Sequence, residues 1–120
     1  MSVNRPPLGA LVDPFRWWGR LTPDKVAIVD RLRGTRATYR DIDDAAQRWM
    51  TLLVGRGVQR GDRVALLSMN RIEVVGLFYG CVRLGAALVP LNWRLAEPEL
   101  VRVVSDARVA LLVGEARFSA

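Results

Sequence analysis

The stretch that most constrains the fold runs from residue 63 to residue 91. RVALLSM at 63–69 and AALVPL at 86–91 are continuous apolar runs, and IEVVGLFYGCVRLG at 72–85 between them is apolar on nearly every side. Strands that are apolar on both faces belong inside a parallel sheet, and parallel strands need a long crossover, usually a helix, to connect them. Strand, helix and strand within about thirty residues therefore predict a parallel βαβ unit.

The same alternation continues toward the C-terminus. Glu97-Pro98 is typical of a helix start, and the helix ELVRVVSDA should turn Leu100, Val103 and Val104 inward. RVALLVG at 108–114 then reads as a third parallel strand. A last strand without a covering helix leaves apolar surface in water, so the chain looks like the beginning of a larger unit.

Before residue 63 the pattern changes. KVAIVD and TRATYR are extended runs separated by RLRG, which predicts a β-hairpin with Gly34 at the turn and a solvated, arginine-rich tip. From Thr38 a helical period follows, with Thr38 and Asp41 as its N-terminal cap and Gly55 and Gly57 as its end. The residues expected to face inward are Ile42, Ala45, Ala46, Trp49, Leu52 and Leu53.

The N-terminal region divides at Asp13. Residues 1–13 read as a loose leader, and Asp13-Pro14 opens a short helix, FRWWGRL, that Trp17 and Trp18 should anchor. Residues 14–120 are then one partial α/β domain, because 120 residues suffice for a single modest core.

Composition excludes several kinds of function. The chain is 51% hydrophobic and 25% charged, which is the globular range. One cysteine, Cys81, and no histidine exclude disulfide frameworks, thiolate or imidazole metal sites and histidine-dependent triads within these residues. No apolar run reaches the roughly 20 residues of a membrane span, so a cytoplasmic protein is expected. Lys25 is the only lysine beside many arginines, which favours GC-rich coding and a bacterial source.

The net charge of +6 raises the question of nucleic-acid binding. The arginines are spread along the chain, and no basic face follows from the periodicity, so nucleic acid is not an expected partner. Asp41, Asp43 and Asp44 should favour the dipole of their helix and need not bind metal. Cys81 should be an inert buried thiol.

Ligands of open parallel sheets bind beyond the carboxyl ends of the strands. Two such ends are visible, at residues 68–71 and 91–94, although neither has the glycine spacing of a phosphate loop. Asn70 either caps the following helix or lines a pocket. Trp93 is more typical of packing than of base stacking, and Arg94 could pair with phosphate or carboxylate or simply be solvated. Pro90 should end its ladder for want of an N–H, and Asn92 should cap the next turn.

The order of several phrases is specific. TPDKVAIVD, ATYRDID, GVQRGDRVALLSMN, RLGAALVPLNWRLAEPEL and DARVALLV, spread over residues 15–114, resemble the N-terminal part of the adenylate-forming acyl-CoA synthetases of the AMP-binding superfamily. The chain departs from that pattern at Ala37 and Trp93. The fold implied is α/β: a β-hairpin followed by parallel βαβαβ layers with an incomplete sheet.

The resemblance also implies an activity. Such enzymes join a carboxylate, here expected to be a fatty acid, to ATP with Mg²⁺, and a thiol such as CoA then displaces AMP. The family's triphosphate loop, adenine motif, ribose aspartate and C-terminal lysine lie further along and have no match here, so the chain alone should be inactive. A basic residue after this strand lies near the CoA phosphates in some members, which makes Arg94 a candidate CoA contact.

A second class of function stays open. The uncovered last strand could pair with another chain, which would make this a free-standing interaction or regulatory module capable of self-association. A defined oligomer would favour that interpretation, and aggregation through uncovered apolar surface would not.

Overall fold

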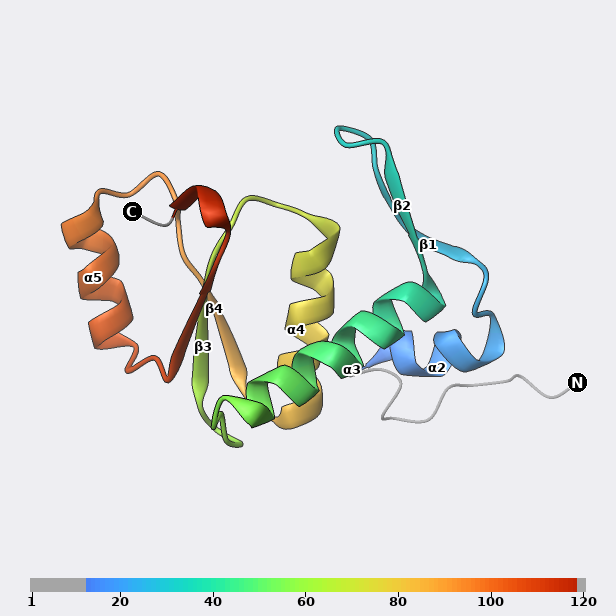
Figure 1. The fold of residues 1–120 in the computed structure, drawn as a ribbon, viewed down its shortest axis with the longest axis horizontal. Coiled ribbons are helices and arrows are strands. Elements are labelled where there is room, and N and C mark those ends of the chain that lie inside the picture. Colours follow the sequence, from blue (N-terminus) through green and yellow to red (C-terminus); the bar gives the residue numbers. More distant parts are fainter. Residues whose placement is uncertain (1–12, 119–120) are drawn as a thin grey trace, which may run out of the picture.

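The computed structural model describes residues 13–118, which form two small sheets and the helices around them (Figure 1). In chain order the elements are α2 (Pro14–Leu21), β1 (Val26–Asp30), β2 (Thr35–Thr38), α3 (Tyr39–Gly55), β3 (Arg63–Leu67), α4 (Ile72–Leu84), β4 (Ala87–Pro90), α5 (Glu97–Asp106), β5 (Leu111–Gly114) and the 3₁₀ helix η1 (Ala116–Phe118). This order confirms the predicted α/β fold. The predicted leader lies outside the described residues apart from Asp13.

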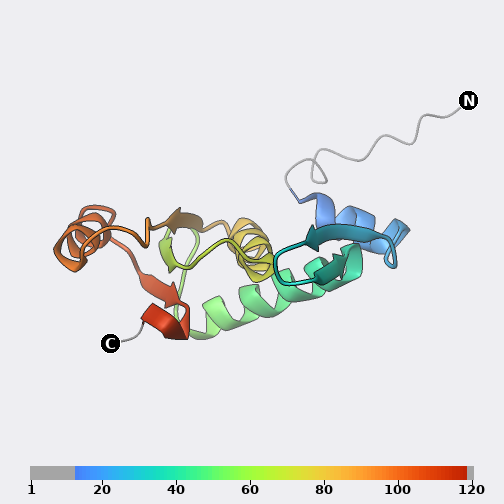
Figure 2. The same ribbon diagram turned by 90° about the horizontal axis from the view of Figure 1, so that it is seen from above.

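The three parallel strands form a sheet in the order β4-β3-β5. Val64 of β3 is in register with Leu88 of β4 and with Leu111 of β5. Helices α4 and α5 lie on opposite faces of these strands, as two views at right angles show (Figures 1 and 2). The predicted parallel βαβαβ unit is therefore confirmed.

The prediction for Pro90 is wrong. Pro90 is in register with Leu66, and the next residue, Leu91, donates its N–H to the carbonyl of Leu66 at 2.8 Å, so the ladder continues past the proline. In a parallel pair, alternate residues of a strand bond to the neighbour. The missing N–H of Pro90 therefore falls on the side of β4 that has no partner strand among residues 13–118.

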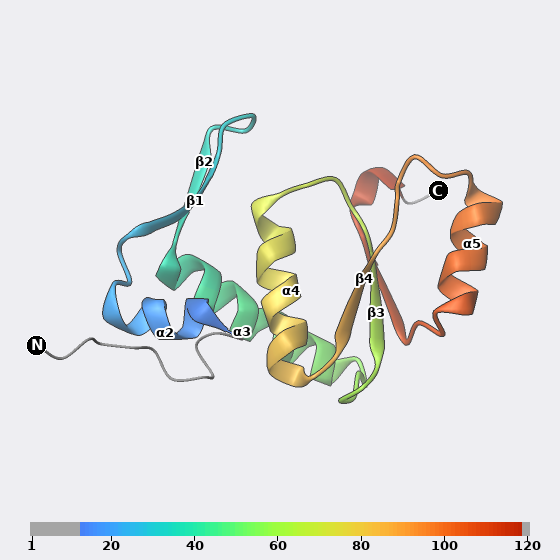
Figure 3. The ribbon, with the colours of Figure 1, turned by 180° about the vertical axis from the view of Figure 1, so that it is seen from behind.

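The predicted hairpin is present and stands apart from the parallel sheet (Figure 3). Ile28 pairs with Ala37 and Val29 with Arg36, and the tip between the strands is exposed. Gly34 has a φ of 65°, a left-handed conformation that glycine adopts without a steric cost. At the base of the hairpin, Thr38 begins α3 as predicted.

The helices α3 and α4 approach each other closely because α4 carries glycine where they cross. A Cβ built on Gly80 would lie 2.7 Å from the Cβ of Trp49, and one on Gly76 would lie 2.9 Å from the Cβ of Ala45. The buried core lies against this pair and the sheet. Its members are Leu53, Val58, Val64, Leu66, Leu77 and Cys81.

Two residues predicted to face inward do not. Leu52 of α3 and Val103 of α5 are exposed, and no residue of α5 is fully buried. Helical periodicity gives a wide apolar face, but only the part that meets another element is covered. Within residues 13–118 the neighbouring elements bury only part of the apolar face of α3 and of α5, and Leu52 and Val103 lie outside that part.

Helix α2 is fastened by charge and by aromatic contacts. Asp13 caps α2 by accepting the N–H of Arg16 at 3.3 Å, as predicted, and also pairs with Arg83 of α4 at 2.6 Å. The ring of Phe15 meets that of Tyr79 edge-on at 4.8 Å. Of the predicted anchors, Trp17 is half-buried and Trp18 is exposed, with its ring 6.5 Å from that of Tyr39. The shorter ring contact of α2 comes from Phe15, which the sequence did not single out.

Candidate functional site

The carboxyl ends of β3, β4 and β5 open onto one edge of the sheet. The cavities along this edge include an inner one of about 280 Å³ and an outer one of about 390 Å³. They share Leu66, Ser68 and Val74. This is the edge at which the sequence predicted a site.

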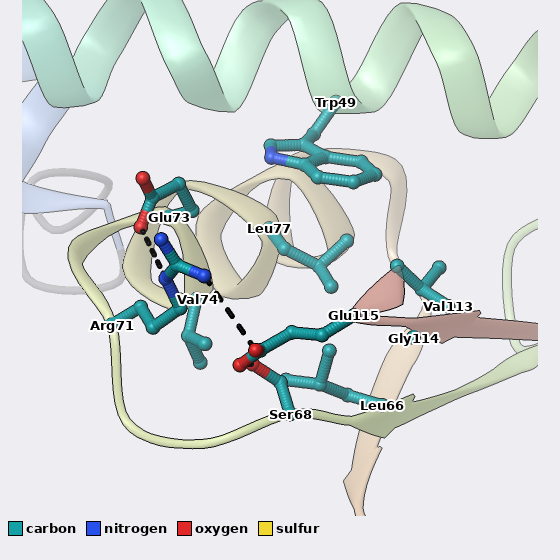
Figure 4. A pocket seen from close by; sticks show the side chains of 10 residues that line it. All are labelled: Trp49, Leu66, Ser68, Arg71, Glu73, Val74, Leu77, Val113, Gly114 and Glu115. Carbon is teal, nitrogen blue, oxygen red and sulfur yellow. Dashed lines mark hydrogen bonds and ion pairs between the residues drawn. The ribbon is translucent and has the colours of Figure 1, made fainter. Parts of the chain in front are cut away.

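The inner cavity lies between α3, α4 and the ends of β3 and β5 (Figure 4). Its wall is mostly apolar, and its polar groups collect on the side of the strand ends, around Glu115. The lining residues are Trp49, Leu66, Ser68, Arg71, Glu73, Val74, Leu77, Val113, Gly114 and Glu115.

Glu115 organises the polar side of this cavity. Its Oε1 accepts the hydroxyl of Ser68 at 2.7 Å and the N–H of Met69 at 2.9 Å. Its Oε2 lies 3.1 Å from Nε of Arg117 and 3.5 Å from Nη1 of Arg71. The hydrogen bond from Ser68, aided by that of Met69 and by the two arginines, holds the pKa of the Glu115 carboxyl below its ordinary value. The carboxylate therefore cross-links the ends of β3 and β5 in its charged form.

Sequence reasoning missed Glu115, whereas Arg71 lies within the predicted edge 68–71 but was given no role of its own. The available signal was position, because Glu115 directly follows a parallel strand just as Ser68 does. Arg71 is the N-cap residue of α4 and makes no side-chain cap. Its Nε lies 3.6 Å from Glu73 Oε2, too far for a hydrogen bond, and is buried without a hydrogen-bond partner in the structure.

Asn70 takes the second of its two predicted roles. The prediction that it caps α4 is wrong, because Arg71 is still extended and occupies the N-cap position itself. Asn70 lines the outer cavity, and its carbonyl accepts Nη1 of Arg33 at 3.0 Å. That bond ties the hairpin to the loop after β3.

The outer cavity brings Arg33, Trp93 and Arg94 to the carboxyl edge. The guanidinium carbon of Arg94 lies 4.7 Å from the centroid of the Trp93 ring, within the range of a cation–π contact. Asn92 accepts the N–H of Arg94 at 3.0 Å, so it shapes the turn after β4 as predicted, while α5 begins later at Glu97. An exposed cation braced on an indole suits an anionic ligand.

Of the other residues considered in the sequence, the cysteine is buried, one aspartate caps a helix and another pairs with an arginine. Cys81 is buried, and this burial raises the pKa of its thiol to about 11. Asp41 forms the predicted cap, because the N–H of Thr38 donates to its carboxylate at 2.9 Å; this bond holds the pKa of Asp41 below its ordinary value. Asp43 binds Arg83.

Among the described residues, no group of three His, Cys, Asp or Glu side chains is placed to hold a metal ion. None of the helices between residues 13 and 118 is long and apolar enough to cross a bilayer.

A parallel sheet with helices on both faces and cavities at its carboxyl edge defines part of an open α/β ligand-binding fold. The family model described as AMP-binding enzyme matches residues 15–119, and the chain belongs to that family. Its fold is that of the N-terminal domain of adenylate-forming synthetases, which confirms the resemblance.

Individual relatives are longer than this chain. It is 41% identical over 87 residues to the long-chain-fatty-acid–CoA ligase FadD13 of Mycobacterium tuberculosis, a match over 72% of this chain and 17% of that protein. It is 30% identical over 116 residues to the fatty acid–[acyl-carrier-protein] ligase ScoC of Streptomyces coeruleorubidus, over 97% of this chain and 22% of that one. The chain therefore spans about a fifth of these relatives.

Solved structures show the same similarity to acyl-CoA synthetases and related enzymes. A fatty acyl CoA synthetase of Mycobacterium tuberculosis superposes with a TM-score of 0.82 at 36% identity, covering 88% of this chain and 21% of that one. VinN superposes with a TM-score of 0.83 at 31% identity, covering 91% of this chain and 27% of that one.

Proposed function

We propose that this chain is the N-terminal part of an AMP-forming acid–thiol ligase that activates a fatty acid with ATP and Mg²⁺ and transfers the acyl group to CoA in the cytoplasm. The observation that carries the proposal is the superposition on a fatty acyl CoA synthetase with a TM-score of 0.82 over 88% of the chain. The fatty acid is favoured because relatives acting on CoA and on a carrier protein both carry fatty acid in their names.

These residues supply the scaffold of such a ligase and not its triphosphate site. The sequence contains neither GxGxxG nor GxxxxGK(S/T), the glycine spacings of phosphate loops, and the described carboxylates do not gather into a magnesium site. Adenylate formation depends on cations and loop amides that hold the triphosphate in the attack geometry. The isolated chain should therefore release no pyrophosphate from ATP and a fatty acid above a protein-free blank.

A chimera tests whether these residues can serve as part of a fatty acid–CoA ligase. Residues 15–119 would replace the matching segment of the ligase FadD13, to which this chain is 41% identical over 87 residues. The chimera should form acyl-CoA, whereas FadD13 without that segment should not. A chimera that folds, as judged by circular dichroism, yet makes neither acyl-adenylate nor acyl-CoA would refute the proposal.

We also propose Arg94 as a contact for a CoA phosphate. The guanidinium is exposed, is braced on Trp93, and lines the same cavity as Arg33. In the chimera, Arg94→Gln should raise the KM for CoA about tenfold, the value of one charge-assisted hydrogen bond, and leave acyl-adenylate formation unchanged. Arg102→Gln, which removes an exposed arginine of α5, is the matched control. An unchanged KM for CoA would remove Arg94 from the site.

A further inference from the structure

The tip of the β1–β2 hairpin is an unusual surface. The hairpin projects beyond the start of α3, with residues 31–34 at its far end, where Leu32 and Arg33 also line the outer cavity (Figures 1 and 3). Leu32 at this tip is 95% exposed, more than any other large apolar side chain among the described residues. Val29 on the adjoining strand is 54% exposed and is in register with Arg36.

Arginines stand on both sides of this leucine in the sequence. Residues 30–36 read DRLRGTR, with three arginines against one aspartate, a net charge of +2. The aspartate, Asp30, is already neutralised by Nη1 of Arg33 at 3.0 Å. Arg31 and Arg36 are exposed.

The tip is also held in one position. The N–H of Arg33 donates to Asp30 at 3.1 Å, which closes the turn, and Nη1 of Arg33 reaches the carbonyl of Asn70 at 3.0 Å. Behind the tip, a shallow cavity of about 390 Å³ between the hairpin and α4 continues the apolar surface through Ile72 and Val75. A fixed tip loses little conformational entropy when it binds.

We propose that the hairpin tip docks on an anionic lipid surface, with Leu32 entering the boundary of the acyl chains and Arg31 and Arg36 at the phosphates. Single exposed leucines are common on soluble proteins, and the inference rests on the leucine together with the exposed Arg31 and Arg36 near it at the end of a projecting hairpin. Interfacial anchors combine these two features, apolar burial and attraction to anionic headgroups. A nucleic acid would use the arginines but leave Leu32 without a role, and the tip has no aromatic ring for base stacking.

Vesicle co-sedimentation with the full 120-residue chain tests this proposal. The chain should bind vesicles of phosphatidylcholine and phosphatidylglycerol in equal parts and should bind phosphatidylcholine alone far less. Leu32→Ser should weaken binding to the anionic vesicles about tenfold, since it removes most of the apolar burial. Arg31→Gln and Arg36→Gln should each weaken it about fivefold, and added salt should act in the same direction.

Matched control variants distinguish binding through the tip from non-specific adsorption caused by exposed apolar side chains or by net charge. Leu112→Ser removes an exposed leucine of β5, and Arg56→Gln and Arg102→Gln each remove the same charge as one of the two arginine variants of the tip. These controls should bind like the wild type. Equal effects of tip and control variants, or binding that Leu32→Ser leaves unchanged, would overturn the proposal. Binding to a DNA duplex that is lost in the arginine variants and kept in Leu32→Ser would also overturn it, in favour of nucleic acid. None of these readouts requires ligase activity.

Discussion

Replacing Arg83 by methionine tests the ion cluster that fastens α2 onto α4. The Arg83 side chain is 4% exposed and pairs with two carboxylates, through Nε to Asp13 at 2.6 Å and through Nη2 to Asp43 at 2.5 Å. Nη1 also donates to the backbone carbonyl of Asp43 at 3.1 Å. Each nitrogen of the guanidinium therefore has its own acceptor.

Arg83→Met should lower the free energy of unfolding because it leaves the carboxylates of Asp13 and Asp43 without their partner. Removing one partner of a buried ion pair costs roughly 3–5 kcal/mol, mostly because the other charge is left buried and uncompensated. Asp13 is 11% exposed and Asp43 is 26% exposed, so water can reach Asp43 and relieve part of the penalty. We expect a loss of about 3 kcal/mol in the free energy of unfolding.

Urea unfolding followed by tryptophan fluorescence measures this loss, because Trp17 and Trp18 lie on α2. Arg83→Lys should recover only part of the stability, since one ammonium cannot reach all three acceptors. Adding Asp13→Asn and Asp43→Asn to Arg83→Met should recover more, because no charge is then left unpaired and asparagine still caps α2. If Arg83→Met unfolds at the same urea concentration as the wild type, the cluster contributes nothing and this reasoning fails.

Three further changes have defined outcomes. Gly80→Ala should lower the free energy of unfolding by about 2 kcal/mol, because its Cβ would lie 3.1 Å from the backbone atoms Ala46 O and Met50 N. Gly55→Ala, which has open space around it, should be neutral or stabilising in the same urea assay. Equal effects of the two variants would contradict the close contact at Gly80. Glu115 has a lowered pKa, so its contribution to stability is present above its ordinary value of 4.5 and is lost as pH falls through the folded value; Glu115→Gln should unfold with a weaker acid dependence, and an unchanged pH profile would count against the network. Cys81 should react with iodoacetamide only on unfolding, because burial raises its thiol pKa to about 11; labelling of the native chain would disprove its burial.

The fold could be predicted where a local pattern decides it. The parallel βαβ unit follows from the two apolar strands around an apolar helix, and the hairpin follows from Gly34 between two extended runs. The predictions for Leu52 and Val103 were wrong because periodicity gives the apolar face of a helix and not the width that a neighbour covers.

The site could be predicted in its location but not in its chemistry. Asn70 and Arg94 were placed at the carboxyl edge by strand order alone, and both line the outer cavity there. Glu115 was missed because it meets Ser68 across 47 residues, a contact that exists only once β5 pairs with β3. The Asp13 and Arg83 contact spans 70 residues and gives no local signal at all.

Pro90 affects where a further strand could pair with the parallel sheet. In the described residues β4 and β5 are the two edges of the parallel sheet. On β4, Pro90 offers no N–H toward its free side, and a proline on an edge strand discourages further pairing. On β5, N–H groups alternate in the same way and no proline interrupts them: Ala110 donates to Arg63 at 2.8 Å, which leaves the N–H of Leu111 on the free side. A further strand would therefore pair more readily beside β5 than beside β4.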